Sequence, residues 1–348
     1  MNLNDLVREN IKKLKPYSSA RGKFTKGILM DANENPFSSV VENISANLNR
    51  YPDPNQIELR KVIGKYLGME YQKIFVGVGS DEIIDLLIRI FCKPGIDEAL
   101  IFEPTYGMYK VACDINDIKI NSVLLNDDYQ IDLSAVSREI INRSKIIFLC
   151  SPNNPTGNTL SAQSILSICE NSNGIVVLDE AYIDFCDDQS LIKKNESIPN
   201  LVIIRTFSKA WGLAGVRCGY CIADRELIDW LLKIKAPYNI NKLTEQTIIN
   251  SIKNADQKDE NVKRILSERE FLIAELKSLK EVQKVFPTDS NFILFRINNA
   301  FSIKNKLADK GIIIRDRSNQ PLLENCLRVS VGTREENKLF ITELKKVI

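Results

Sequence analysis

The sequence of 348 residues contains no histidine. This absence excludes Ser-His-Asp and Cys-His catalytic groups, because both need an imidazole base. It also removes the side chain that most often binds metal ions in proteins, and we expect no metal site. Proton transfer must therefore depend on lysine, carboxyl, tyrosine or cysteine side chains, or on a bound cofactor.

The chain carries little net charge. Its 47 lysines and arginines nearly balance its 45 aspartates and glutamates, and no cluster of basic residues stands out along the sequence. Proteins that bind nucleic acids usually carry such clusters. We therefore expect no nucleic-acid partner.

Long apolar runs are also missing. None approaches the ~20 residues that a membrane helix needs, and acidic residues interrupt the N-terminus early. We expect neither a membrane segment nor a secretory signal. Leu3, Val7, Ile11 and Leu14 recur at helical spacing. This pattern predicts a short amphipathic helix that packs on its own protein or on a partner subunit.

The eight cysteines are scattered and form no disulfide framework. Cys150 follows four apolar residues, and a reduced, buried cysteine behaves as a small hydrophobic residue. Cys218 and Cys221 have the spacing of a redox motif, but they lie in a strand-like run from Val216 to Ala223. Redox motifs are instead found near strand-helix units. We expect buried thiols and, in consequence, the cytoplasm as the compartment.

Short apolar runs alternate with helical patterns from about residue 60 onward. Residues 82–91 have helical spacing, and strand candidates follow at 99–102, 145–150, 175–179, 201–205 and 216–222. These runs show little alternation, which is typical of strands buried on both faces in a parallel sheet. The pattern predicts an α/β fold that binds its ligand beyond the carboxyl ends of the strands.

The C-terminal third has a different pattern. Residues 241–280 are charged and helical, and strand candidates follow at 291–295, 311–316 and 326–332. A single core stops growing at roughly 250–300 residues. We therefore predict an N-terminal segment that associates with the small domain or the partner subunit, a large domain and a smaller α+β domain, at 1–40, 41–240 and 241–348.

Polar residues follow the predicted strands. Ser80 and Asp81 open a helix, whose backbone amides can bind an anion, although capping by either side chain would explain them equally well. The dinucleotide-binding fingerprint fails here because Glu82 stands where it needs glycine. Tyr106 lies in a loop marked by proline and glycine, where it can stack on a planar ligand or simply cover the sheet edge.

Two further strand ends carry an amide and a carboxyl group. Asn153 and Asn154 stand between two prolines, which restrict the backbone of a tight turn. Asp179 ends an apolar strand, where a carboxylate is costly unless it is paired or hydrogen-bonded. For the two asparagines the alternative is an ordinary turn, and for Asp179 it is a helix N-cap.

Lys209 follows the next strand, with Ser208 beside it and Arg217 further on. A lone lysine would be a surface charge, but this one lies among small and aromatic residues that favour a lowered pKa and an amine nucleophile. The strand ends together supply an anion site, a stacking aromatic, an amide, a carboxylate and an amine. This is the set that pyridoxal phosphate needs, and we expect it as the cofactor.

Ordered motifs cover nearly the whole chain. They include SPNNPTG, DEAY and SKAWGLAGVRCGY, together with segments at 14–21, 31–37, 50–54, 79–95, 104–109, 311–316 and 327–337. These motifs resemble those of the class I and II aminotransferases and, more narrowly, of the histidinol-phosphate aminotransferases. The resemblance implies a fold-type I pyridoxal-phosphate transferase with a mostly parallel central sheet. It also implies transfer of the amino group of L-histidinol phosphate to 2-oxoglutarate, which yields imidazole-acetol phosphate and L-glutamate.

The resemblance also implies roles for individual residues. Lys209 would be the Schiff-base lysine and the proton carrier, Asp179 would pair with the pyridinium nitrogen, and Asn154 and Tyr182 would contact the ring hydroxyl. The remaining cofactor contacts implied are Ser80, Asp81, Tyr106, Ser208, Arg217 and, from the other subunit of a homodimer, Tyr51.

The resemblance implies that Tyr17, Arg315 and Arg328 hold the substrate. The planar fork of arginine suits both a phosphate and a carboxylate, so one arginine pair can serve both substrates of a transamination. For Arg315 the alternative is a structural ion pair with Asp309 or Asp316.

Other functions stay open on the residues alone. The same cofactor would serve an aromatic aminotransferase or a threonine-phosphate decarboxylase. A non-catalytic regulator could bind it too, although Lys209, Asp179 and Arg328 are all present. The failed glycine fingerprint opposes a nicotinamide-dependent oxidoreductase.

Overall fold

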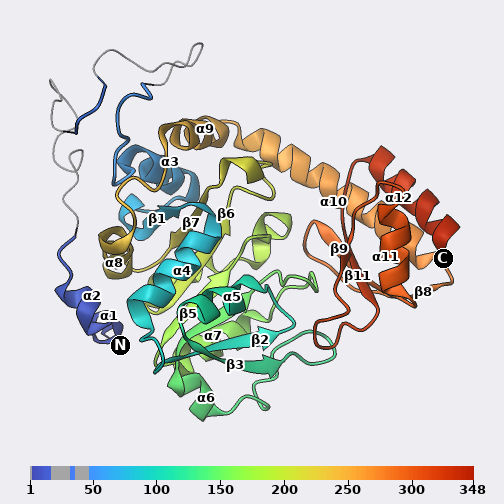
Figure 1. Cartoon of the computed structure of the whole chain (residues 1–348), viewed down its shortest axis with the longest axis horizontal. Helices are drawn as coiled ribbons and strands as arrows, with labels where there is room; N and C mark the ends of the chain where they lie inside the picture. The colour runs from blue at the N-terminus through green and yellow to red at the C-terminus, as the bar shows by residue number, and fades with distance from the viewer. Residues whose placement is uncertain (1, 17–31, 36–46) are drawn as a thin grey trace.

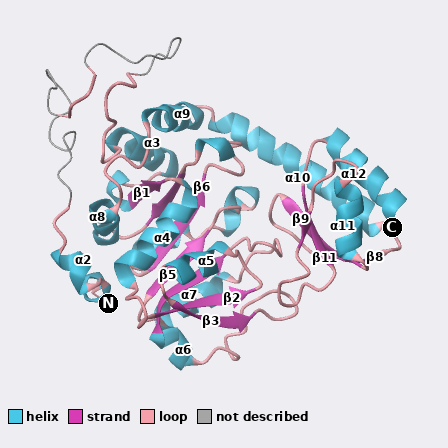
Figure 2. Cartoon of the chain, in the orientation of Figure 1, coloured by secondary structure: helices cyan, strands magenta, loops and turns pink. Residues whose placement is uncertain are grey.

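The structure is a computed structural model that describes residues 2–16, 32–35 and 47–348. It contains a large sheet flanked by helices and a smaller sheet beside it, joined by one long helix (Figures 1 and 2). The predicted α/β architecture with a second, smaller lobe is confirmed.

The large sheet has seven strands within the described residues, in the order β1-β7-β6-β5-β4-β2-β3. Strand β7 runs antiparallel to both of its neighbours, and the other pairs are parallel. Strands β4, β5 and β6 are almost wholly buried, as their unbroken apolar sequences predict. The bounds are β1 Ile74–Gly77, β2 Glu98–Glu103, β3 Lys119–Leu124, β4 Ser144–Cys150, β5 Ile175–Asp179, β6 Leu201–Thr206 and β7 Gly219–Ile222.

Helices cover both faces of this sheet. One apolar cluster joins it to α4 (Gly79–Phe91), α5 (Met108–Ile115) and α8 (Arg225–Ile234). A second cluster, on the other face, joins it to α3, α6, α7 and α9. Their bounds are α3 Ile57–Leu67, α6 Arg138–Arg143, α7 Ala162–Asn171 and α9 Lys242–Ile252. Short 3₁₀ helices lie at η2 Tyr71–Lys73, η3 Ile183–Phe185, η4 Asp187–Gln189, η5 Ile192–Ser197 and η6 Ala214–Val216.

The smaller sheet is antiparallel, in the order β10-β11-β9-β8. It packs with α10, α11 and α12 around a core of its own. The bounds are α10 Ala255–Lys277, β8 Val282–Val285, β9 Phe292–Ile297, α11 Ala300–Ala308, β10 Arg315–Asp316, β11 Cys326–Ser330 and α12 Arg334–Val347. Helix α9 still packs on α3 of the large domain. The domain limits at residues 40 and 240 remain a prediction.

The N-terminal pattern forms two helices, α1 (Leu3–Leu6) and α2 (Glu9–Lys13), so the prediction of a single helix is wrong. The helix is interrupted at Arg8, because the backbone N–H of this residue donates to the Ile90 carbonyl at the end of α4 (3.0 Å). Leu3 and Val7 are buried against α4, so the packing on its own protein is confirmed.

Three predicted strands are shorter than expected, among them 326–332, which ends as β11 at Ser330. The run 216–222 becomes a strand only at Gly219, because Arg217 adopts a left-handed backbone with φ +55°. In the run 311–316 only Arg315 and Asp316 form β10, since Gly311 (φ +81°) and Ile312 still close the end of α11.

The eight cysteines are all reduced, and all except Cys186 are buried, which confirms the expected structural thiols. Within the described ranges, no helix has the length and apolar content that crossing a membrane requires.

Candidate active site

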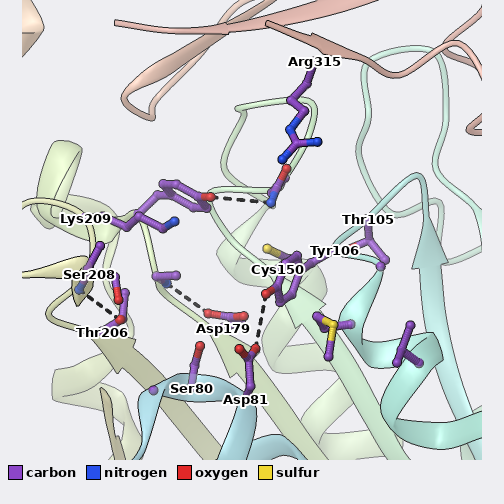
Figure 3. A pocket seen from close by; sticks show the side chains of 18 of the residues that line it. Ser80, Asp81, Thr105, Tyr106, Cys150, Asp179, Thr206, Ser208, Lys209 and Arg315 are labelled. Atoms are coloured by element: carbon purple, nitrogen blue, oxygen red, sulfur yellow. Dashed lines mark hydrogen bonds between the residues drawn. The ribbon is translucent and has the colours of Figure 1, made fainter. Parts of the chain in front are cut away.

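A cavity of about 550 Å³ opens at the carboxyl ends of β4, β5 and β6, with β10 and β11 on its far side. Its size is that of a small-molecule site. It brings together most of the residues predicted from the sequence, several of which are labelled in Figure 3. These are Ser80, Asp81, Tyr106, Asn154, Asp179, Tyr182, Ser208, Lys209, Arg217, Arg315 and Arg328.

Asp179 lies at the floor of the cavity as the last residue of β5, and its side chain is almost fully buried. Its Oδ2 accepts a hydrogen bond from Tyr109 Oη (2.8 Å), and its Oδ1 accepts one from the Ala181 backbone N–H (3.0 Å). Burial raises the pKa of this carboxyl to about 6, although both hydrogen bonds lower it. The helical turn that follows has Tyr182 at its N-cap position, so Asp179 is not its cap. The carboxyl group is therefore held ready for a cationic partner.

Tyr109 was missed by the sequence analysis. It is fully buried in α5, stacks on Phe148 at 4.8 Å between ring centroids, and meets Tyr106 edge to face at 5.5 Å. These packing contacts fix its hydroxyl against Asp179. Its position three residues after Tyr106, at the start of the helix that follows the loop, is the sequence signal that could have found it.

Lys209 follows β6, and its side chain opens into the cavity. Its Nζ lies 5.4 Å from the centre of the Tyr182 ring, and in the described chain it makes no hydrogen bond or ion pair. Burial lowers the pKa of this amine, and the charge of Arg328 lowers it further. Both effects favour the neutral amine, which is the nucleophilic form.

The two neighbouring asparagines of the 151–157 turn have different tasks. Asn153 points into the protein, where its Nδ2 donates to the Pro104 carbonyl (2.8 Å) and its Oδ1 accepts from Thr105 Oγ1 (3.0 Å). It therefore ties two strand-end loops together. Asn154 faces the cavity, with Nδ2 3.5 Å from Tyr182 Oη and Oδ1 accepting from Arg328 Nη1. The turn is thus a support for Asn154 and not merely a chain reversal.

The N-terminus of α4 forms an anion cradle. Its N-cap is Val78, and no side chain caps the helix, so the alternative that Ser80 or Asp81 serves as a cap is wrong. A Cβ on Gly79 (φ +73°) would lie 2.8 Å from Arg217 Nη2, so the missing side chain leaves room for the guanidinium. Free amide groups, a helix dipole and an adjacent arginine suit a phosphate group.

Further contacts fix the groups around this cradle. Asp81 lies 3.7 Å from the Arg217 guanidinium and accepts a hydrogen bond from Tyr106 Oη (3.2 Å). The Ser208 backbone N–H donates to Thr206 Oγ1 (3.1 Å). Thr206 lines the cavity and was also missed by the sequence analysis. Burial raises the pKa of the Tyr106 hydroxyl, which keeps it a hydrogen-bond donor.

The far wall of the cavity is built from arginines. Arg315 in β10 pairs in register with Arg328 in β11, and Arg317 and Gln320, both missed by the sequence analysis, line the cavity beside them. The alternative ion pair of Arg315 with Asp309 or Asp316 does not form, because Asp316 instead binds Ser318. Burial, and next the charge of Arg317, lower the pKa of Arg328 to about 10. This wall is suited to an anionic ligand.

Two predicted site residues are not among those that line the described cavity. Tyr17 lies outside the described residues. Tyr51 does not line the cavity but stacks on Tyr238 (4.5 Å between ring centroids) in a second hollow of about 420 Å³. Its predicted role in the site of a partner subunit remains a prediction.

The side chains fit pyridoxal phosphate. Asp179 can face a pyridinium nitrogen, Lys209 an aldehyde and the cradle at Gly79 a phosphate. The part of the chain that the structure describes has no group of acidic or cysteine residues able to hold a metal ion.

Known proteins resemble this chain along nearly its whole length. A family model described as aminotransferase class I and II matches residues 24–344. A histidinol-phosphate aminotransferase from Christiangramia forsetii is 47% identical over 350 residues, which cover 99% of this chain and 98% of that protein. One from Flavobacterium johnsoniae is 45% identical over 348 residues, with coverage of 99% and 98%. A solved histidinol-phosphate aminotransferase from Clostridium acetobutylicum has a TM-score of 0.80 and 27% identity, covering 86% of this chain and 91% of that one.

Proposed function

The chain belongs to the class I and II aminotransferases, and from this premise we propose that it transfers the amino group of L-histidinol phosphate to 2-oxoglutarate. The products are imidazole-acetol phosphate and L-glutamate, as a step of histidine biosynthesis. The observation that carries the proposal is one cavity in which Lys209 and Asp179 face a wall of arginines that form no ion pair with a carboxylate of the described residues. The full-length similarity to histidinol-phosphate aminotransferases supports it.

The family works with pyridoxal phosphate, which is the cofactor of this chain, and the fold is the fold-type I architecture. When bound, this group withdraws electrons from the substrate α-carbon and thereby makes its proton acidic. Asp179 would keep the ring nitrogen protonated. Asn154 and Tyr182 would donate to the ring hydroxyl, and Tyr106 would cover the ring.

Lys209 has two tasks in this proposal. Its Nζ would anchor the cofactor, and as a free amine the same atom would take the proton from the substrate α-carbon. The lowered pKa of this amine leaves a lone pair available for that step. Because Lys209 lines the same cavity as Tyr182, Arg315 and Arg328, with its Nζ 5.4 Å from the centre of the Tyr182 ring, the amine can reach a substrate bound there.

Arg315 and Arg328 bind the anionic end of the substrate. Histidinol phosphate has no α-carboxylate, so its phosphate must take the place that a carboxylate of glutamate takes in the second half-reaction. A guanidinium remains charged and binds either anion through two parallel N–H groups.

The first experiment is a single half-reaction followed by absorbance. Purified holoenzyme is mixed with L-histidinol phosphate and no keto acid. We expect the band of the lysine-bound cofactor to be replaced by that of the aminated cofactor, with one imidazole-acetol phosphate formed per active site. The Lys209→Ala variant, which lacks the proton carrier, is the control.

Other outcomes are equally informative. Conversion by glutamate or an aromatic amino acid, but not by histidinol phosphate, would retain the aminotransferase and refute this amino donor. Release of carbon dioxide from threonine phosphate would indicate the decarboxylase instead. A protein that takes up no pyridoxal phosphate would contradict the proposal as a whole.

We further propose that the chain acts as a cytoplasmic homodimer with shared active sites. Tyr51 is half exposed, in a hollow that it shares with Tyr238 and Asn241. It is therefore available to a second copy and absent from its own cavity. Its hydroxyl would contact the cofactor phosphate in the partner subunit.

Hybrid dimers test this arrangement. Tyr51→Ala and Lys209→Ala each impair every site of a pure dimer. In a mixed dimer one site combines the intact Lys209 of one subunit with the intact Tyr51 of the other. We expect activity to rise on mixing and re-association, toward about one quarter of the wild-type value for random pairing. Mixed samples no more active than the average of the two variants would show that Tyr51 acts within its own subunit or not at all.

A further inference from the structure

The arginine wall contains a third guanidinium, at Arg317, which the proposed reaction does not use. In the antiparallel pairing of β10 with β11, Arg315 lies opposite Arg328, and the Arg317 backbone N–H donates to the Cys326 carbonyl (2.9 Å). Side chains two residues apart on a strand point to the same face. Arg317 therefore joins Arg315 and Arg328 on the face that lines the cavity.

The position of Arg317 is fixed by its neighbours. Asp316 points to the opposite face, where its Oδ1 accepts from the Ser318 backbone N–H (2.8 Å) and from Ser318 Oγ (2.5 Å). A turn follows, in which the Gln320 N–H donates to the Arg317 carbonyl (3.0 Å). This turn brings the Gln320 side chain to the cavity as well. The segment is thus an ordered part of the wall and not a loose loop.

Polar atoms of this wall are buried without partners. Arg317 Nε, Arg328 Nε and Gln320 Oε1 are shielded from solvent, and none has a hydrogen-bond partner among the described residues. No carboxylate of the described chain pairs with Arg315, Arg317 or Arg328 within 4.0 Å. Buried polar groups are rarely left unpaired unless a ligand completes them. Burial, and next the charge of Arg315, lower the pKa of Arg317, as expected for crowded cations that lack an anion.

Charge counting distinguishes the two anions that the site must accept. A side-chain carboxylate carries one charge and two oxygens, which one or two guanidinium groups satisfy. A phosphomonoester carries nearly two charges at neutral pH and has three acceptor oxygens. Three guanidinium groups exceed what a carboxylate can balance, whereas they match a phosphate dianion.

We propose that Arg317 is a specificity-determining residue, a third guanidinium that favours a phosphomonoester over a monocarboxylate at the arginine wall. The inference rests on the proposed function in that the amino donor is taken to be phosphorylated. Arg317 binds the phosphate together with Arg315 and Arg328 and contributes little to the binding of glutamate. Gln320 limits the same pocket from the side of the turn.

The test uses the Arg317→Gln and Arg317→Lys holoenzymes. Loss of a charge-assisted hydrogen bond at a half-buried site is equivalent to about a 10- to 100-fold change. We expect Arg317→Gln to lower the ratio of kcat/KM for histidinol phosphate to that for glutamate by this factor, through KM and not through kcat. Arg317→Lys restores part of the ratio because it keeps the charge. The matched control is Arg264→Gln, which removes the same charge from an exposed position on α10.

Inorganic phosphate provides a readout that is independent of the amino donor. As a competitive inhibitor of the wild-type holoenzyme with any active pair of substrates, it should bind about 10-fold more weakly to Arg317→Gln. Equal losses for both substrates, with phosphate inhibition unchanged, would overturn the inference. A wild-type enzyme that ignores histidinol phosphate would instead refute the proposed function, while the phosphate measurement would still decide the role of Arg317. Loss of the holoenzyme in Arg317→Gln with an unaltered ratio in Arg317→Lys would also count against it.

Discussion

Replacing Lys209 by alanine is expected to lower turnover by about 10⁴-fold or more. The substitution removes the amine that anchors the cofactor and the base that takes the substrate proton, and general acid–base catalysis alone contributes about 10²- to 10⁴-fold. No other group offers an immediate substitute, because the chain has no histidine and Tyr182, the neighbouring hydroxyl, has a raised pKa owing to its burial. Steady-state turnover and the absorbance of the bound cofactor measure the two losses separately.

The cradle at α4 and Asp179 remain intact in this variant, so we expect Lys209→Ala to retain the cofactor non-covalently. Its absorbance should be that of a free aldehyde and not of a lysine adduct. Lys253→Ala, on the exposed end of α9, is the matched control. A Lys209→Ala protein with the wild-type spectrum and turnover would show that another amine holds the cofactor, and the mechanism would then be wrong.

Replacing Asp179 by asparagine is expected to reduce kcat by about 10²- to 10³-fold, the usual effect of removing one preorganised charge from an active site. The amide has nearly the same shape but cannot keep the cofactor nitrogen protonated. The substrate α-proton then becomes less acidic, although the substrate still binds. We expect KM for both substrates to change far less than kcat, and steady-state kinetics distinguish the two.

Tyr109→Phe perturbs the Asp179 carboxyl group without removing it. The Tyr109 hydroxyl donates to Asp179 and lowers the pKa of its carboxyl group. Burial raises this pKa by more, and the net value is about 6. Without the hydroxyl the pKa rises, so the carboxylate becomes protonated at a higher pH as the solution is acidified. The bound cofactor cation lowers the same pKa in both proteins. The acidic limb of the plot of kcat against pH should therefore move to higher pH. At a pH in the middle of this limb, kcat should fall by about tenfold.

Tyr129→Phe is the control for general loss of packing, because Tyr129 is also buried but lies in the core away from the cavity. An acidic limb that stays in place in Tyr109→Phe would show that Asp179 does not govern it. Full activity in Asp179→Asn would remove the carboxylate from the mechanism.

Most of the site was located by the rule that ligands bind beyond the carboxyl ends of parallel strands. Asn154, Asp179 and Lys209 each stand at or just after the end of a buried apolar strand. Parallel strands end at the same edge of the sheet, so these residues meet in one cavity. Arg317 was within reach of a similar argument, since it stands two residues after Arg315 and shares its face. It was missed because the run 311–316 was taken as the whole strand.

Other features depend on contacts that no local pattern contains. The break at Arg8 is set by the end of α4, more than eighty residues away. Strand β3 was overlooked because it is an edge strand of mixed polarity, with no face fully buried. The proposed role of Tyr51 would require a second copy of the chain, which the sequence pattern of one chain does not describe.

The long helix α10 connects the large sheet with the small one. Its 23 residues span about 35 Å. Near its first turns Val262 packs with Tyr182 in a small apolar cluster behind the cavity, whereas Leu272 and Leu276 belong to the core of the small domain. A tilt of about 5° at the first turn would carry the far end through about 3 Å. That distance separates a direct guanidinium contact from one bridged by water. The arginine wall therefore keeps its place only while α10 and the apolar cluster that Leu294, Leu323 and Cys326 share with the large sheet hold the two parts together.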